Sequence, residues 1–417
     1  MTFITSAIFY IVIFTSVYVQ VFFLVTFLQN RKKIFIRDRE VVLSRYPRVT
    51  IIVPCWNEET TIYKTIRSLL NLNYPKDKIT FFLIDDGSTD GTWHIIEKFE
   101  KYANIKIFHK ENGGKYTALN FGLENTETEF VGCLDADSIV DKEALRRIFT
   151  YFEKDASIMA VAPAVVVNEP KGILQNAQRV EYNMGIYFKK MLGFLGAINV
   201  TPGPFTIFRK KVFDDLGPYK HAHNTEDMEI AYRMQKNHYK IEHCNDAYVY
   251  TNTPVALNKL FKQRLRWIYG FINNTLDYRA IVLDRKYGNF SLFTLPTGSL
   301  TVLAVVYVFF SGLYNIGQFI YSKILEYQII GFHFSGWPGN FDFFFINTQT
   351  SFIVTIGAYS MVIFAIIFGK QMTRGTKEKW GFPYQVIYYF VVFSFIAPFW
   401  IMNAVYNTLI SRTPAWR

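Results

Sequence analysis

Acidic residues end two short apolar segments in the first third of the chain. The segment ITFFLIDD ends in Asp85 and Asp86, and Asp135 and Asp137 form a D-x-D pair after FVGCL. Carboxylates gathered at one edge repel each other unless a cation lies among them, and a D-x-D pair suits Mg²⁺ or Mn²⁺ that bridges to phosphates. Either motif alone would also fit an ordinary turn or helix cap. On successive strands they favour a nucleotide and metal site.

The elements that must position these acids alternate along the chain. Short β-branched and aromatic runs alternate with helical patterns, which predicts an α/β fold with a doubly wound, mostly parallel sheet. Ligands of such sheets lie outside the carboxyl ends of the strands, so Pro54 to Glu58, at the end of the first strand, join the aspartates there. We expect strands over 48–54, 79–85, 104–110 and 129–135, and helices over 58–72, 88–102, 114–125 and 141–154.

Two glycines and a lysine open the third expected helix. Gly113, Gly114 and Lys115 in GGKYTALN favour anion binding by backbone N–H groups and a lysine. The spacing differs from that of a P-loop, which argues against a P-loop ATPase. An ordinary junction between a loop and a helix would show the same residues.

A later segment, HNTEDMEIAYRMQKN, places Thr225 as a helix cap and Glu226 and Asp227 in the first turn. The helix dipole favours acids at that position without any function. However, a carboxylate fixed at a helix start after the loop TPGPF could also face a cleft. There it could take a proton from a substrate hydroxyl.

The segment NKLFKQRLRWIYG carries Gln263, Arg266 and Trp267 at spacing i, i+3, i+4, so they share one helix face. A planar guanidinium fork, an indole ring and an amide suit a diphosphate and its sugar. An interfacial helix with Arg and Trp among lipid headgroups explains much of the same composition. Arg264 falls on the apolar face and needs a partner or a route to water. That face carries Leu257, Leu260, Phe261, Ile268 and Phe271.

Composition indicates a membrane protein, because 50% of the 417 residues are hydrophobic and 18% are aromatic. The first of four long apolar stretches lacks a basic region before it, so we expect an uncleaved anchor rather than a signal peptide. Each stretch is long enough to span a bilayer. The stretches cover roughly 4–28, 295–321, 351–369 and 386–410.

The net charge of +11 fits a lipid surface better than nucleic acid, because basic residues gather beside the apolar stretches. By the positive-inside rule, the basic segments at 30–39 and 370–379 predict that the region between the spans lies in the cytosol. We expect the membrane to be the plasma membrane. The number of C-terminal spans, about three, stays open. Cys55, Cys133 and Cys244 lack metal-ligand spacing and are expected to be reduced core thiols.

The motifs PCWNEE, DDGS, GGKYTALN, DAD, TED and QRLRW occur in this order between an N-terminal anchor and C-terminal spans. Together they resemble the membrane-integrated family 2 glycosyltransferases, which include synthases of cellulose, poly-N-acetylglucosamine, chitin and hyaluronan. The resemblance covers about 48–275 motif by motif. It implies a GT-A fold and inverting transfer from a UDP-sugar, with UDP-N-acetylglucosamine or UDP-glucose favoured, onto a growing β-linked polysaccharide. The transfer would be coupled to translocation.

The resemblance also implies roles for individual residues. Asp227 would be the general base, with Glu226 beside it. Mg²⁺ or Mn²⁺ would be held by Asp137, and the acceptor would be bordered by Trp267, Gly203 and Pro204. The nucleotide-sugar would contact Pro54, Glu58, Asp86, Lys115, Asp135, Gln263 and Arg266.

The expected organisation has an N-terminal transmembrane helix (1–30), a cytosolic GT-A domain (31–254), an interface helix region (255–293) and a C-terminal transmembrane region (294–417). Expected partners are the UDP-sugar, a polysaccharide or lipid-linked acceptor and the bilayer; participation of an accessory membrane subunit stays open. Transfer of a single sugar to a membrane lipid is the alternative activity. The acids and arginine of the site argue against a silent scaffold.

Overall fold

The computed structural model describes residues 3–35, 43–331, 350–373 and 384–414. The chain divides into two compact units, and the larger one comprises Phe23–Pro296 and Phe364–Arg417. The smaller unit comprises Met1–Phe22 and Thr297–Ile363. All the candidate site residues lie in the larger unit. The predicted basic segments 30–39 and 370–379 extend beyond the described residues.

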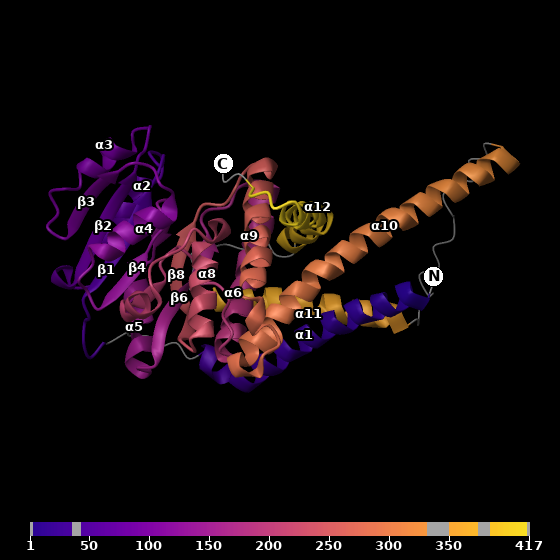
Figure 1. Ribbon diagram of the computed structural model, residues 1–417, viewed down its shortest axis with the longest axis horizontal. Helices are drawn as coiled ribbons and strands as arrows, with labels where there is room; N and C mark the ends of the chain where they lie inside the picture. The colour runs from indigo at the N-terminus through magenta and orange to yellow at the C-terminus, as the bar shows by residue number, and fades with distance from the viewer. Residues whose placement is uncertain (1–2, 36–42, 332–349, 374–383, 415–417) are drawn as a thin grey trace. The chain divides into compact units, whose positions relative to one another are not determined.

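An eight-stranded sheet organises the larger unit, in the order β3-β2-β1-β4-β7-β6-β8-β5 (Figure 1). Neighbours among β1 to β4 pair in parallel, as do β6 and β8. The pairings β4 with β7, β6 with β7 and β5 with β8 are antiparallel, so the expected mostly parallel sheet is a mixed one. The strands are β1 (Val49–Cys55), β2 (Ile79–Asp86), β3 (Ile105–Lys110), β4 (Phe130–Cys133), β5 (Ser138–Val140), β6 (Ile158–Val167), β7 (Ile207–Arg209) and β8 (Lys240–Thr251).

The sheet is buried on both faces, which explains the continuous apolar runs of its central strands. In β1, Ile51 and Val53 pack into the core beneath α2 and α5, whereas Ile52 packs into the opposite core with residues of α4 and α8. The register pairs Cys55 with Asp85, and Asp86 with Lys110. The polar strand ends therefore meet at one edge, as the alternating pattern predicted.

Several predicted helices begin later than expected. The helix expected over 58–72 begins at Ile62, because Thr61 N–H and Ile62 N–H bond the carbonyl of Glu58 and make a turn first. The helices of the sheet region are α2 (Ile62–Leu70), η1 (Lys76–Lys78), α3 (Thr92–Glu97), α4 (Lys115–Glu124), α5 (Ala144–Lys154), α7 (Lys211–Leu216), η2 (Ala222–Asn224) and α8 (Glu226–Lys236).

Longer helices lie beyond β6 and β8 in Figure 1. Asn273 of α9 donates to Thr408 of α12 at 3.0 Å, and Gln385 of α12 donates to Asn176 of α6 at 2.9 Å. These contacts join the helix with the Q-x-x-R-W motif to an apolar C-terminal helix. The elements are α6 (Gly172–Phe194), α9 (Leu257–Asp277), η3 (Arg279–Ile281), η4 (Arg285–Tyr287), η5 (Phe290–Thr294) and α12 (Tyr384–Leu409).

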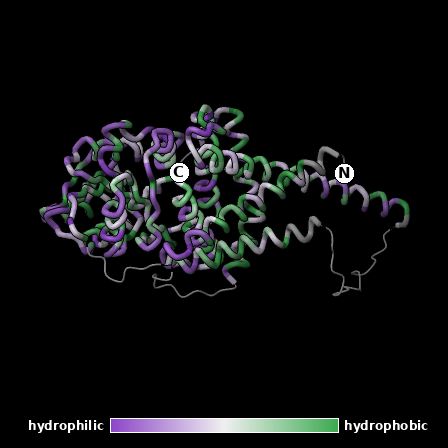
Figure 2. Tube along the Cα trace, turned by 90° about the horizontal axis from the view of Figure 1, so that it is seen from below, coloured by the Kyte–Doolittle hydropathy of each residue, from purple (hydrophilic) through white to green (hydrophobic). Residues whose placement is uncertain are grey.

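The chain is a membrane protein by the length and composition of its helices. Within the described residues, Tyr10–Ile34, Phe290–Ile329 and Tyr384–Leu409 are long and apolar enough to cross a bilayer. The stretch expected at 351–369 corresponds to a shorter apolar helix, Ile356–Met372. Figure 2 shows the long helices hydrophobic over most of their length, whereas the sheet region is mixed. The remaining helices are α1 (Phe3–Phe35), α10 (Leu295–Ile330) and α11 (Thr350–Met372).

The three cysteines are buried and form no disulfide, which confirms the expectation of core thiols. Burial raises the pKa of the Cys133 thiol to about 12. These side chains therefore remain protonated at neutral pH.

Candidate active site

The carboxylate of Asp86 is enclosed at the end of β2. Lys110 Nζ lies 2.5 Å from its Oδ1. The N–H of Gly113 donates to Oδ1 at 3.1 Å, and the N–H of Gly114 donates to Oδ2 at 2.9 Å. The N–H groups of the glycine loop thus bind an anion, which here is a carboxylate of the protein itself. The loop therefore fixes the orientation of Asp86.

The end of β1 is tied to the loop after β2. Pro54 is half-buried in β1, and the backbone N–H of Glu58 donates to Thr92 Oγ1 at 2.7 Å. The Glu58 carboxylate accepts a hydrogen bond from Thr61 at 2.7 Å. Since both loops are fixed to one another, Glu58 and Asp86 are presented from a rigid strand edge.

Lys115 connects the end of β4 with the start of α8. Its Nζ lies 2.6 Å from Asp135 Oδ1 and 3.1 Å from Glu226 Oε1. Burial lowers the pKa of Lys115, but Asp135, Glu226 and Asp227 together raise this pKa well above its ordinary value. The lysine therefore remains charged and gathers the acids of two distant sequence motifs.

Asp137 lies near the same acids on the side of β5. Burial, Asp135 and Glu58 raise the pKa of Asp137 to about 7, and a hydrogen bond from Ser138 opposes the rise. Repulsion of this kind is relieved by a cation among the carboxylates. In the part of the chain that the structure describes, no group of three or more His, Cys, Asp or Glu side chains is placed to hold a metal ion. The carboxylates of Asp137, Asp135 and Glu58 that repel one another are oxygen ligands of the kind that a hard divalent ion takes together with phosphate oxygens.

Glu226 and Asp227, the first residues of α8, occupy different electrostatic environments. Burial and Glu226 raise the pKa of Asp227 to about 6, and Lys115 and Arg266 oppose this rise. Burial also acts to raise the pKa of Glu226, but Lys115 and Arg266 bring this pKa below its ordinary value. Asp227 is therefore the acid of this pair with the greater affinity for a proton.

The backbone of Asp227 is held by the segment that precedes the predicted acceptor loop. Both the N–H and the hydroxyl of Thr201 donate to the Asp227 carbonyl, at 3.1 and 2.8 Å. A Cβ atom on Gly203 would lie 2.6 Å from Lys115 Nζ and 3.0 Å from Asp135 Oδ1. Gly203 therefore borders the acidic cluster at Lys115 and Asp135, and the half-buried Pro204 follows it in the same loop.

The Q-x-x-R-W residues of α9 contact different groups. Arg266 Nη1 donates to the Asn224 carbonyl at 2.7 Å, just before the acids of α8. Gln263 Oε1 instead accepts from Arg264 Nη1 at 2.8 Å, and the Arg264 guanidinium lies 4.1 Å from the Trp267 ring centroid. Of the two residues expected to clamp a diphosphate, Arg266 lies at the acids, and Gln263 is engaged with its neighbour.

Arg264, which lies on the apolar face of α9, has an acidic partner. Its Nη2 pairs with the carboxylate of Glu181 on α6, and the arginine side chain is buried. Sequence reasoning missed Glu181, as it missed Lys110 beside Asp86. For Lys110 a signal existed, because a strand-end lysine beside a strand-end aspartate is predicted once β2 and β3 are paired. For Glu181 only the contact between two helices reveals the pair.

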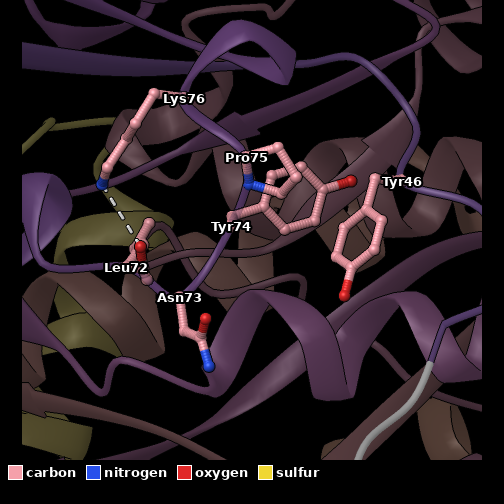
Figure 3. Close-up of a pocket in the computed structure, with 6 residues that line it drawn as sticks. All are labelled: Tyr46, Leu72, Asn73, Tyr74, Pro75 and Lys76. Carbon is pink, nitrogen blue, oxygen red and sulfur yellow. Dashed lines mark hydrogen bonds between the residues drawn. The ribbon is translucent and has the colours of Figure 1, made fainter.

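A separate pocket of about 460 Å³ lies at the opposite, amino-terminal ends of β1 and β2. Its lining includes Tyr46, Asn73, Tyr74 and Lys76 (Figure 3). Tyr74 donates to the Pro47 carbonyl at 2.7 Å. None of the predicted site residues lines this pocket, so it is distinct from the acidic cluster.

Known proteins resemble this chain over most of its length. Residues 50–217 match the family Glycosyl transferase family 2. The chain is 30% identical over 319 residues to the poly-beta-1,6-N-acetyl-D-glucosamine synthase of Staphylococcus epidermidis, covering 76% of this chain and 74% of the relative. The chain is a family 2 glycosyltransferase. A synthase of the same name from Staphylococcus aureus (strain COL) is 31% identical to this transferase over 262 residues, or 62% of this chain and 63% of the relative.

A solved structure shares the fold of the transferase. A mannosyltransferase from Pyrobaculum calidifontis, in complex with GDP-Man and Mn²⁺, superposes with a TM-score of 0.52 and 16% identity, covering 86% of this chain and 98% of that one. This likeness confirms the expected GT-A type architecture, with a mixed sheet flanked by helices.

Proposed function

We propose that this glycosyltransferase moves N-acetylglucosamine from UDP-N-acetylglucosamine to the 6-hydroxyl at the end of a growing β-1,6-linked polysaccharide. The supporting observation is the 30% identity to a poly-beta-1,6-N-acetyl-D-glucosamine synthase over 319 residues. That length exceeds the 50–217 domain match and so extends into the other parts of the transferase. Within the described residues the transferase also has three helices that are long and apolar enough to cross a bilayer, which fits a product that leaves through the membrane.

The nucleoside would bind at the ends of β1 and β2. Asp86, held by Lys110 and two backbone N–H groups, presents a fixed carboxylate there, with Pro54 and Glu58 on the neighbouring strand edge. A preorganised acceptor of this kind binds N–H donors of a base without losing freedom. We assign this edge to the UDP moiety.

Mg²⁺ or Mn²⁺ would be held by Asp137 together with phosphate oxygens of the donor. The fit rests on the repulsion among Asp137, Asp135 and Glu58, which raises the pKa of Asp137 to about 7. When bound, such an ion neutralises charge on the leaving diphosphate. Lys115 and Arg266 lie near the acids and would also stabilise the negative charge on the leaving diphosphate.

Asp227 would be the general base. The acceptor hydroxyl attacks the anomeric carbon as the bond from that carbon to the diphosphate oxygen breaks, and the electron pair leaves with UDP. Attack from the opposite face converts the α-linked donor into a β-linkage. The hydroxyl proton passes to Asp227, whose pKa of about 6 leaves it ionised at neutral pH yet able to accept a proton. Glu226 serves as the ionised partner of Lys115.

The acceptor would lie between Asp227, Trp267 and the loop with Gly203 and Pro204. A tryptophan ring offers a flat apolar surface for a sugar ring. The Arg264 guanidinium lies 4.1 Å from the centroid of the Trp267 ring and helps to fix its position. We place the transferase domain in the cytosol and the chain as a multi-pass protein of the plasma membrane. The product would then pass from the cytosolic site towards the spans.

The test measures UDP release by the purified full-length protein in lipid nanodiscs with Mn²⁺. Donors are UDP-N-acetylglucosamine, UDP-glucose, UDP-galactose, UDP-glucuronate and GDP-mannose, and Asp227→Asn is the control. Product length and linkage are read in parallel. We expect release with UDP-N-acetylglucosamine and a β-1,6-linked polymer. Release with another donor only, or a lipid carrying a single sugar, would contradict the proposal.

A further inference from the structure

The helix face that carries Arg266 continues beyond the Q-x-x-R-W motif. At about 100° per residue, Gly270, Asn274 and Asp277 fall within about 80° of Arg266. These residues lie on α9, and Asn274 is fully buried. The face thus extends over three turns of the helix, of which the motif is only the first.

This face contacts a backbone segment of unusual conformation, residues 221–225, which we name the base loop. It leads directly into α8 and ends two residues before Asp227. Ala222, His223 and Asn224 have φ angles of 43°, 56° and 62°. Successive left-handed non-glycine residues are unfavourable and persist only where the surrounding structure holds them.

The structure shows what holds the base loop. Asp277 Oδ2 lies 2.8 Å from His223 Nε2. Asn274 Nδ2 donates to Thr225 Oγ1 at 2.9 Å, and Arg266 donates to the carbonyl of Asn224 at 2.7 Å. Three consecutive loop residues are therefore each bound by one side chain of the same helix face.

The absence of a side chain at Gly270 permits this close approach. A Cβ atom there would lie 2.4 Å from both Oγ1 and Cγ2 of Thr225. Asn274 also donates to the Gly270 carbonyl at 2.8 Å, while its amide oxygen is buried without a hydrogen-bond partner. Burying an unpaired amide oxygen is unfavourable, so the bonds that its Nδ2 makes must offset that cost.

Resting on the proposed function, we propose that Asn274 and Asp277 are positioning residues for the general base. Arg266 has two tasks, because its guanidinium both bonds the base loop and faces the acids where the diphosphate is expected. The hydrogen bonds of Asn274 and Asp277 go to the base loop and, for Asn274, also to the Gly270 carbonyl of its own helix. They keep the base loop, and with it Asp227, in place while Arg266 engages the donor.

Hydrogen exchange of the base loop tests this inference without any turnover. In the full chain in nanodiscs, exchange of the peptide that covers 221–227 is measured for Asn274→Ala and for Asn273→Ala. Asn273 is the matched control, because this neighbour of the same type bonds Thr408 of α12 instead of the loop. We expect exchange to be roughly fivefold faster in Asn274→Ala, the loss of one hydrogen bond, and unchanged in the control. Equal exchange in both would overturn the inference.

Asp277 supplies a second pair of variants at an exposed position where folding is not at risk. Asp277→Asn keeps an oxygen acceptor for His223, whereas Asp277→Ala removes it. With UDP-N-acetylglucosamine, we expect Asp277→Ala and Asn274→Ala to lower kcat about tenfold with KM within twofold of wild type, because the base is displaced and donor contacts are not. Asp277→Asn should recover most of kcat.

The kinetic outcomes separate the two proposals. Wild-type protein that releases no UDP from any donor contradicts the proposed function, and the exchange measurement still decides the role of the base loop. A raised KM with unchanged kcat in Asn274→Ala, or failure of Asp277→Asn to recover kcat, would overturn the positioning role.

Discussion

Two carboxylates of this transferase, the buried Asp86 and the half-buried Asp227, are held in different ways. Asp86 has both oxygens satisfied by Lys110 and by two glycine N–H groups that follow it within 28 residues of sequence. Asp227 lies near Asp135 after β4, Lys115 of α4, Arg266 of α9 and the loop around Thr201, and its pKa is raised to about 6. A locally satisfied carboxylate suits a fixed binding role, whereas one held by distant elements with a raised pKa suits proton transfer.

The largest expected effect comes from the base itself. Asp227→Asn keeps the size of the side chain but removes its ability to accept the proton, so we expect kcat to fall by about 10²- to 10⁴-fold. Donor KM should change little, because the donor edge is elsewhere. Steady-state UDP release measures both constants, and the exposed Asp214→Asn on α7 is the matched control. A loss confined to KM would show that Asp227 binds the donor instead.

Gly270→Ala tests whether the position of α9 sets the geometry of the base. The new methyl group would lie 2.4 Å from Thr225, so the helix or the base loop must shift. A displacement of this kind is expected to lower kcat about 10- to 100-fold. Gly185→Ala on α6 is the control, since a Cβ there has no atom within 4 Å. Equal activity of the two variants would show that Thr225 can move without consequence.

The pH dependence of the reaction should report Asp227. Its carboxylate accepts a proton only when ionised, so kcat/KM should fall about tenfold per pH unit below a pKa of about 6. Lys115 lowers this pKa, and Lys115→Met should therefore move the acidic limb to higher pH. UDP release from pH 5 to 8 measures the acidic limb of the wild type and of the variant. An acidic limb that stays in place in the variant would place the titrating group outside the cluster.

Sequence predicted the placement of the strand-end acids better than the surroundings of the proposed base. Parallel strands bring their carboxyl ends together by topology, so Asp86 and Asp135 could be placed at one edge from an alternating pattern alone. The sequence predicts helix at Glu58, where the structure has a turn, because acids at a helix start and acids in a turn look alike in sequence.

The base region depends on helix packing that sequence does not reveal. The shared face of Gln263, Arg266 and Trp267 follows from helical spacing, but the rotation of α9 that turns Arg266 to Asn224 and leaves Gln263 with Arg264 depends on its contacts with α6 and α8. The base loop contains no glycine, the residue that would indicate a left-handed backbone in the sequence. These features arise from tertiary contacts, which no local pattern encodes.

The most direct test of the division between the two carboxylates is UDP affinity. Titration calorimetry in nanodiscs with Mn²⁺ compares wild type, Lys110→Met and Asp227→Asn, with a thermal melt of each variant to verify folding. Loss of the charged bond from Lys110 frees Asp86 and should weaken UDP binding about tenfold, while Asp227→Asn should bind within about twofold of wild type. Weaker binding by Asp227→Asn, or full affinity of Lys110→Met, would contradict the assignment of donor binding to Asp86 and of proton transfer to Asp227.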